Sequence, residues 1–372
     1  MNMQNAVIER YSQGARKRAE ELCCPVDYAP ELLHILPQEI IDRDYGCGDP
    51  SRYVREGDTV LDLGSGGGKA CYIAAQLTGK NGRVIGVDMN DDMLALARKY
   101  QNEMALKLGG DRVEFRKGYI QDLALDVDTL RQRLAQQPVT DTASLDALEL
   151  WKQDQRRNHP MIPDNSIDLV ISNCVLNLVE DIYKRDMVLE IFRVLKPGGR
   201  IAISDIVSDE PIPQQLKEDK QLWSGCISGA FLEQQLLEVL CEAGFQGVCI
   251  NKWSSEPWRV VEGIEFRSVT ITAIKGESGS ALDMGHAVIY RGPFSFVRDD
   301  DGHEYPRGQR IAVSEQTFRM LTNEPYGENF IGITPTMDRD PSPWCTPSGT
   351  LRPARETKSG IHSSAKSGTC CC

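Results

Sequence analysis

The 372-residue sequence lacks the features that direct a protein to a membrane or to nucleic acid. It has no apolar run as long as the roughly 18 residues of a membrane-spanning helix. Residues 1–22 are polar and helical in pattern, without the apolar segment of a secretory signal peptide. Basic residues are in deficit, with 42 Lys and Arg against 54 Asp and Glu, whereas nucleic-acid-binding surfaces are basic. We therefore expect a cytoplasmic protein with a small-molecule substrate and with no membrane or nucleic-acid partner.

The closely spaced Cys-x-x-Cys pair is also missing, although the chain has 12 cysteines. Such pairs supply the ligands of many structural zinc sites, so their absence disfavours a zinc knuckle or ribbon. Disulfide frameworks are rare in reducing compartments, and the cysteines therefore favour metal binding or thiol chemistry. The cysteines are Cys23, Cys24, Cys47, Cys71, Cys174, Cys226, Cys241, Cys249, Cys345, Cys370, Cys371 and Cys372.

The most informative motif is LDLGSGGG at 61–68, which lies between a strand pattern and a helix pattern. A second strand pattern, VIGVDM, ends in Asp88. A glycine-rich strand-to-helix turn lets a ligand approach the backbone, and an acid at the end of the next strand accepts hydrogen bonds from ribose hydroxyls. The turn carries Asp62 ahead of its glycines and is not a dinucleotide fingerprint. This form is typical of S-adenosylmethionine (SAM) sites, the alternative being a tight turn without a ligand.

Alternating strand and helix patterns predict an α/β fold with a parallel sheet. We expect strands at 59–63, 83–88, 112–116, 166–172 and 199–205, and helices at 69–78, 91–108 and 181–195. This order indicates a doubly wound, Rossmann-like class I SAM methyltransferase fold, in which ligands bind at the carboxyl ends of the strands. Residues 125–163 interrupt it with a polar, helical pattern, which we interpret as an inserted helical pair or as an acidic loop.

The remaining segments predict further regions on either side of this domain. The expected organisation is an N-terminal helical segment (1–57), a SAM-binding domain (58–207), a helical and loop region that holds the substrate (208–257), a smaller β-rich domain (258–335) and a disordered tail (336–372). The tail is rich in Pro, Ser, Thr, Gly and Arg and is poor in aliphatic residues, so it has little apolar surface to bury.

Five segments form a pattern more specific than the glycine turn. They are DYGCGDP at 44–50, GSGGGKACYIAAQLTG at 64–79, SNCVLNLV at 172–179, LWSGCISGA at 222–230 and VIYRGPF at 288–294. In these segments the chain resembles the arsenite methyltransferases, which methylate trivalent arsenic with SAM. Many methyltransferases share the glycine turn, but four cysteines in four separate motifs make the resemblance specific. It implies an enzyme that methylates arsenite, and methylarsenite, in arsenic detoxification.

The resemblance also implies roles for individual residues. Cys174 and Cys226 resemble the pair that holds arsenic, while Cys47 and Cys71 resemble cysteines used in binding and in thiol–disulfide steps. We expect Cys71 to be a third arsenic ligand. Positions that match SAM contacts are Tyr45, Gly64, Ser65, Gly66, Asp88, Met89, Ile120 and Asn173. A thiol reductant, glutathione or thioredoxin, is the implied co-substrate.

The chemistry of arsenic supplies an independent reason for thiols beside a SAM site. Trivalent arsenic is soft and selects thiolates over carboxylates or imidazoles. Its lone pair can attack the sulfonium methyl directly, so positioning is the main task of the protein. Cys174 follows a strand at its carboxyl end, and Cys226 lies in a loop rich in Gly and Ser. We expect Cys241 and Cys249, in apolar surroundings, to be buried packing residues.

Two other interpretations predict different behaviour. A SAM methyltransferase of a small organic molecule would keep its activity in a Cys174→Ser variant. A thiol-rich metalloid-binding protein would bind arsenic without transferring a methyl group. Asp205 is expected either to line the site or to cap the turn that follows, and the sequence assigns no role to Cys23, Cys24 or the three terminal cysteines.

Overall fold

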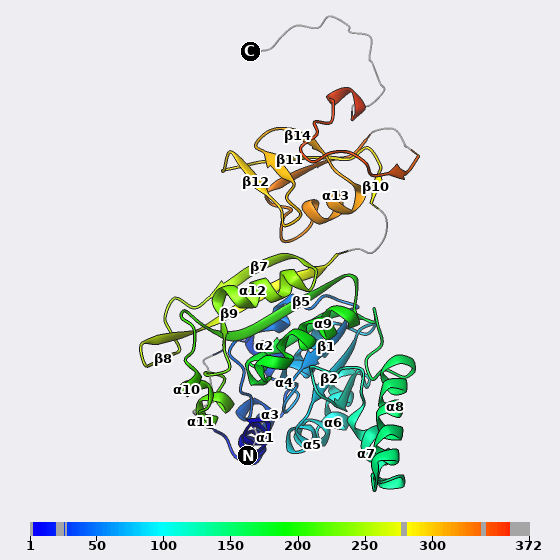
Figure 1. Ribbon diagram of the computed structural model, residues 1–372. Helices are drawn as coiled ribbons and strands as arrows, with labels where there is room; N and C mark the ends of the chain where they lie inside the picture. Colours follow the sequence, from blue (N-terminus) through cyan, green and yellow to red (C-terminus); the bar gives the residue numbers. More distant parts are fainter. Residues whose placement is uncertain (1–2, 20–25, 27, 277–280, 336–339, 358–372) are drawn as a thin grey trace, which may run out of the picture. The chain divides into compact units, whose positions relative to one another are not determined.

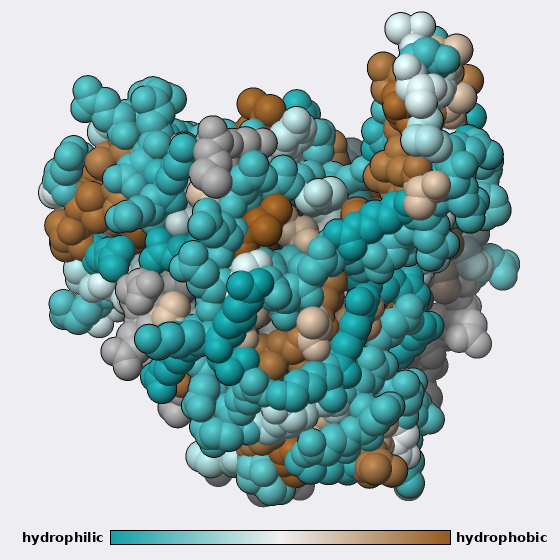
Figure 2. Space-filling model, turned by 90° about the horizontal axis from the view of Figure 1, so that it is seen from below, coloured by the Kyte–Doolittle hydropathy of each residue, from teal (hydrophilic) through white to brown (hydrophobic). Residues whose placement is uncertain are grey.

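The chain folds into two compact units, residues 1–276 and 277–372. The structure, a computed structural model, describes residues 3–19, 26, 28–276, 281–335 and 340–357. None of the helices in these ranges is long and apolar enough to cross a membrane. Figure 2 shows a face dominated by hydrophilic side chains, on which hydrophobic ones gather only in separate areas.

The first unit is built on a nine-stranded sheet with the order β3-β2-β1-β4-β5-β9-β7, from which β6 and β8 branch (Figure 1). Its strands are β1 (Thr59–Leu63), β2 (Arg83–Asp88), β3 (Val113–Lys117), β4 (Ile167–Asn173), β5 (Leu195–Ser208), β6 (Phe231–Leu232), β7 (Phe245–Trp253), β8 (Arg259–Val261) and β9 (Ile264–Lys275). The first five strands are parallel, and β1 pairs with both β2 and β4. The strand order therefore reverses at β1, which is where ligands bind in such sheets. The predicted fold class is confirmed.

Helices cover both faces of this sheet (Figure 1). The helices of this unit are α1 (Met3–Arg16), α2 (Pro30–Leu33), α3 (Gln38–Asp42), α4 (Lys69–Leu77), α5 (Asp91–Lys99), α6 (Gln101–Leu108), α7 (Val127–Gln136), α8 (Thr142–Asn158), α9 (Lys184–Val194), α10 (Gln214–Lys217), α11 (Lys220–Ser224) and α12 (Glu233–Glu242), with 3-10 turns η2 (Pro50–Tyr53), η3 (Leu176–Leu178) and η4 (Asp181–Tyr183). Successive strand residues point to opposite faces. Val60 accordingly packs with Ile73 of α4, and Leu61 belongs to the cluster that contains Ile191 of α9.

Local signals explain where the helices near the site begin and end. The side chain of Asn90 caps α5 by accepting hydrogen bonds from the backbone N–H groups of Asp92 and Met93. The expected helix 91–108 is divided at Tyr100, whose backbone is not helical. The segment 125–163 contains two helices, α7 and α8, each capped by an aspartate.

The sequence-based boundary at 258 differs from the division in the structure. Strands β8 and β9 lie beyond it, yet both belong to the main sheet, and the second unit begins at residue 277. β9 pairs antiparallel with β5 along nearly its whole length and buries Phe266, Val269 and Ile271. Its alternating apolar pattern gives no sign of which sheet it joins, because that depends on a long-range pairing.

The second unit has its own small core. Its elements are β10 (Leu282–Asp283), β11 (Ala287–Tyr290), β12 (Phe296–Arg298), β13 (Glu304–Pro306), β14 (Arg310–Ala312), α13 (Glu315–Thr322), β15 (Phe330–Ile333), β16 (Ser342–Pro343) and the 3-10 turn η5 (Ala354–Glu356). A three-stranded sheet, β14-β11-β15, buries Val288, Ile311 and Phe330 together with Leu321 of α13.

The expectation of a disordered tail is wrong for residues 340–357. β16 pairs with β10, and Leu351 bridges to Ile311. Arg352 is buried and forms an ion pair of 2.8 Å with Asp283. These polar and backbone contacts stabilise a segment that has little apolar surface of its own. Composition alone does not reveal such contacts. The other residues of the expected tail lie outside the described ranges.

We predict that Arg352→Ala lowers the free energy of unfolding of the second unit by about 1–3 kcal/mol, because Asp283 loses a charged partner. Urea denaturation of the full chain measures this change. Arg355→Ala, an exposed arginine in the same segment, is the control and is expected to stay within about 0.5 kcal/mol. Equal stability of the two variants would contradict an ordered role for this segment.

Candidate active site

One pocket lies at the carboxyl ends of β1, β2 and β4, and it collects the residues expected to contact the cofactor. The expected residues that line it are Tyr45, Asp62, Gly64, Ser65, Gly66, Asp88, Met89, Ile120 and Asn173. Cys174 lines the same pocket. Residues separated by more than a hundred positions in the chain therefore share one cavity, because parallel strands end at a common edge of the sheet.

The glycine turn packs closely against the end of β2 and against Val175. The N–H groups of Gly64 and Ser65 both donate to the carbonyl oxygen of Val87 at the end of β2. Gly64 has φ +67°, and a Cβ there would lie 2.5 Å from the side chain of Val175. A side chain at this position would therefore displace Val175 and strain the turn, which accounts for glycine here.

The pocket offers the polar groups that SAM requires. Asp88 accepts hydrogen bonds of 2.8 Å from the backbone N–H groups of Gly66 and Asn90, and burial raises its pKa. The hydroxyl of Ser65 is buried and has no hydrogen-bond partner. A carboxylate positioned by the turn and a buried hydroxyl awaiting a partner both suit a ligand rich in hydroxyl and amino groups.

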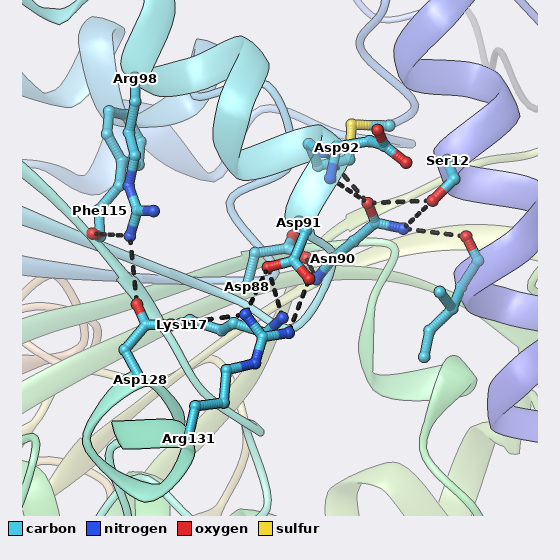
Figure 3. Close-up of polar contacts among 12 residues, drawn as sticks. Ser12, Asp88, Asn90, Asp91, Asp92, Arg98, Phe115, Lys117, Asp128 and Arg131 are labelled. Atoms are coloured by element: carbon cyan, nitrogen blue, oxygen red, sulfur yellow. Dashed lines mark hydrogen bonds and ion pairs between the residues drawn. The ribbon is translucent and has the colours of Figure 1, made fainter. Parts of the chain in front are cut away.

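The acidic loop that follows Asp88 pairs with basic residues from three elements, of which Figure 3 shows Lys117 and Arg131 beside Asp91. Lys117 of β3 and Arg131 of α7 both pair with Asp91, and these cations hold the pKa of Asp91 at about 2. Arg16 of α1 pairs with Asp92. The inserted helix α7 thus contributes a charge to the loop that carries Asp88.

Asp62 lies at the buried end of the pocket, beneath the glycine turn. Only 2 % of its surface is exposed, and its carboxylate accepts a hydrogen bond of 3.1 Å from the thiol of Cys71. Burial raises the pKa of Asp62 to about 7. Burial and the neighbouring Asp62 also raise the pKa of Cys71 well above its usual value, so Cys71 is a protonated thiol.

Three cysteines gather beside the pocket. Cys47, Cys174 and Cys226 belong to one small buried cluster, in which Cys47 and Cys174 form a disulfide bond. The thiol of Cys226 donates to the carbonyl oxygen of Cys174 at 3.2 Å. Cys174 and Cys226 have φ values of +59° and +60°. Left-handed backbone is uncommon for residues other than glycine and tends to occur at functional sites.

Asn173 connects the cysteines to the pocket. Its side-chain oxygen accepts hydrogen bonds from the N–H groups of Cys47 and Gly48 at 2.8 and 3.0 Å, and its amide donates to the carbonyl oxygen of Gly48 at 2.7 Å. A Cβ on Gly46 would lie 2.1 Å from that amide nitrogen. The loop at 44–50 therefore needs a glycine there to reach β4.

Asp205 both caps a turn and lines the cysteine cluster. It is fully buried and accepts hydrogen bonds from the backbone N–H groups of Val175 and Leu176. Its carboxylate and the sulfur atoms of Cys47 and Cys174 lie within 4.8 Å of one another. Burial raises the pKa of Asp205 to about 6. Asp205 therefore lines the cysteine cluster, and the turn that it caps is the one after Cys174 rather than a turn that follows Asp205 itself.

The structure does not bring Cys71 into the cluster that contains Cys174 and Cys226. Cys71 packs with α4 and the sheet in a different cluster, and Cys47 takes its place beside the other two. The first turn of α4 points its thiol at β1, a direction that the sequence alone leaves open. Cys241 is exposed and Cys249 is partly buried, so the expectation that both are buried is wrong. Cys23, Cys24 and the terminal cysteines lie outside the described residues.

Helix α1 supplies pocket residues that sequence analysis did not identify. Gln4, Val7 and Tyr11 line the cavity, together with Asn90 and Met93 of the cofactor loop and α5. The amphipathic pattern of α1 was visible in the sequence, but nothing in it indicated which surface the helix covers. The acidic MNDDM loop at 89–93 gave only a weak indication that another element packs there, because its aspartates require basic partners.

Comparisons with known proteins show the family to which the chain belongs. A methyltransferase domain family matches residues 55–145 and 135–244, and a domain family of unknown function (DUF8838) matches residues 277–362. The arsenite methyltransferase of Aquipseudomonas alcaligenes is 32% identical over 325 residues, which cover 83% of each chain. The chain belongs to the arsenite methyltransferase family.

Further relatives extend this assignment. The arsenite methyltransferase of Homo sapiens is 29% identical over 84% of this chain and 76% of the human protein. The crystal structure of an arsenic(III) SAM methyltransferase from Chlamydomonas reinhardtii is similar with a TM-score of 0.56 and 27% identity, over 87% of this chain and 100% of that chain. This arsenite methyltransferase family member is accordingly a SAM-dependent methyltransferase, and the resemblance drawn from its motifs is confirmed.

We predict that SAM binding strengthens as the pH rises from 6 to 8. Asp62 is neutral below its pKa of about 7 and becomes a carboxylate above it, where it attracts the cationic groups of SAM. One proton changes the affinity by at most about tenfold per pH unit. Calorimetric titration in this range measures the effect.

Asp62→Asn is expected to bind SAM more weakly and without this pH dependence. Asp168→Asn is the control, since Asp168 lies near the opposite end of β4 and its pKa is lowered. A pH-dependent affinity that survives in Asp62→Asn would assign the titration to another group.

Proposed function

We propose that this protein methylates trivalent arsenic, arsenite and then methylarsenite, with SAM as the methyl donor. The observation that carries the proposal is the cluster of Cys47, Cys174 and Cys226 at the edge of the cofactor pocket. Asn173 lines the pocket and Cys174 follows it in the chain, so cofactor and substrate positions meet at the end of β4. The names of the relatives support the same substrate.

The cysteine cluster suits arsenic for a simple chemical reason. Thiolates are the ligands that soft trivalent arsenic prefers, and they leave a lone pair on the arsenic atom. Bound SAM supplies an electrophilic methyl group. The lone pair would form the new As–C bond as the bond between the methyl carbon and the sulfonium sulfur breaks, with S-adenosylhomocysteine as the leaving group. No general base is needed, because the nucleophile carries no proton. Cys174 and Cys226 then act by holding the lone pair in line with the pocket.

The electron balance of this transfer accounts for a disulfide in the site. The new As–C bond formally raises arsenic from the trivalent to the pentavalent state. Two thiolates that join as a disulfide return two electrons and restore trivalent arsenic. Cys47 and Cys174 are positioned for that step, since they are bonded in this structure.

A thiol reductant must then reopen the bond before both cysteines can bind arsenic again. Two external thiols are oxidised to a disulfide, and Cys47 and Cys174 each gain a hydrogen. We propose glutathione or thioredoxin for this role, in the cytoplasm and as part of arsenic detoxification. Cys71, protonated beneath Asp62, is not assigned to arsenic.

We predict that Cys174→Ser and Cys226→Ser each abolish arsenite methylation, by at least about a hundredfold, because a hydroxyl is a poor ligand for arsenic. The affinity for SAM is expected to be unchanged. The product is measured by incubating each variant with labelled SAM, arsenite and glutathione and then separating the arsenic species. Cys241→Ser, an exposed cysteine of α12, is the control.

Full activity of Cys174→Ser would favour an organic substrate. Arsenite binding by the unaltered protein without any methylated product would favour the metalloid-binding interpretation.

We predict that reductant sets the number of turnovers. Protein that is reduced and then freed of reductant is expected to form at most one methyl–arsenic bond per chain, since each turnover closes the Cys47–Cys174 bond. Addition of glutathione or of a thioredoxin system is expected to restore multiple turnovers. Repeated turnover without reductant would rule out the proposed disulfide step.

A further inference from the structure

Helix α1 lies between the cofactor loop and the loop that carries Cys226. It packs against both α5, which follows the Asp88 loop, and α11, which precedes Cys226 (Figure 1). These two helices are more than a hundred residues apart in the chain. Residues in the middle of α1 form specific hydrogen bonds to both sides.

Asn90 forms the attachment on the cofactor side (Figure 3). Its side-chain nitrogen donates to the carbonyl oxygen of Ile8 at 2.9 Å and to the hydroxyl of Ser12 at 3.1 Å. Asn90 is itself bonded to Asp88 through its backbone N–H and caps α5 with its side-chain oxygen. The position of α1 is therefore tied to the loop that carries the cofactor carboxylate.

Arg10 forms the attachment on the substrate side. Its guanidinium donates to the carbonyl oxygen of Gln221 at 2.8 Å and to the hydroxyl of Ser224 at 3.1 Å. Both residues belong to α11, and Cys226 follows two positions after Ser224. These bonds bring the next residue of α1, Tyr11, to the cysteine cluster.

Tyr11 contacts Cys226 directly. Its hydroxyl oxygen lies 3.7 Å from the sulfur atom of Cys226, and its ring packs edge-on against Tyr45 with 6.1 Å between centroids. The Cys226 thiol donates its proton to the carbonyl oxygen of Cys174. Its sulfur therefore acts as the acceptor toward Tyr11, whose hydroxyl is the donor.

Loss of the Cys226 proton removes one of these two hydrogen bonds and keeps the other. A thiolate has no proton to donate to the Cys174 carbonyl oxygen, so that bond disappears when arsenic is bound. The bond from Tyr11 survives, because a thiolate sulfur is an acceptor. Hydrogen bonds to a ligand atom from an outer residue orient that ligand and tune its affinity.

We propose that Tyr11 is a positioning residue for the arsenic site, which holds the Cys226 sulfur in place through its hydroxyl. This inference rests on the proposed function and adds a residue from α1 to it. Tyr11 acts through Cys226, and arsenic itself need not contact the tyrosine. Since α1 is tied to Asn90, the hydroxyl is presented from the wall of the cofactor pocket.

The test is Tyr11→Phe, which keeps the ring against Tyr45 and removes only the hydroxyl. We expect the KM for arsenite and the Kd of the reduced protein for arsenite to rise about 10–100-fold. The Kd for SAM is expected to change much less than the Kd for arsenite, because phenylalanine keeps the ring that lines the cofactor pocket, and the kcat is expected to stay unchanged. Gln13→Ala, an exposed residue of the same helix, is the control and should match the unaltered protein in all four values.

Unchanged arsenite affinity in Tyr11→Phe would overturn the proposal. Equal losses of arsenite and SAM affinity would also overturn it, because they would assign Tyr11 to packing of α1. Failure of the unaltered, reduced protein to bind arsenite would instead remove the proposed function, and calorimetry on that protein separates the two results.

Discussion

The hydrogen bonds of one side-chain amide, that of Asn173, hold the candidate site together. Asn173 ends β4, lines the cofactor pocket and binds the backbone of Cys47 and Gly48 with both its oxygen and its nitrogen. Its neighbour Cys174 is bonded to Cys47. The amide thus fixes the distance between a loop that precedes the sheet and the sheet edge itself. A partly buried amide that uses donor and acceptor together favours a single loop position.

Two kinds of chemical group meet at this edge of the sheet. The cofactor side carries carboxylates, Asp62 and Asp88, which complement a cationic ligand. The cysteine cluster carries sulfur atoms with Ile206 and Phe266 among their neighbours, beside the buried carboxylate of Asp205. Cys174 and Cys226 both have left-handed backbone, and the thiol of Cys226 lies against the carbonyl oxygen of Cys174.

The residues predicted to contact the cofactor line one pocket, because that prediction depends on local order in the chain. A glycine turn after β1 and an acid at the end of β2 are separated by one helix, and parallel strands bring both to the same edge. The cysteines were harder to assign. Their motifs indicated that they matter, yet the direction of Cys71 depends on the first turn of α4, and the partner of Cys174 depends on a loop more than a hundred residues earlier.

The sequence by itself determined the fold class, the cofactor motif and which cysteines lie in family motifs. Hydrophobic periodicity and short motifs are properties of neighbouring residues. Only the tertiary structure decided that Cys47 joins Cys174 and Cys226, that β9 completes the main sheet and that α1 covers the pocket. Each of these is a contact between segments far apart in the chain. Such contacts form when buried surfaces and hydrogen bonds match in three dimensions, and no local pattern records that match.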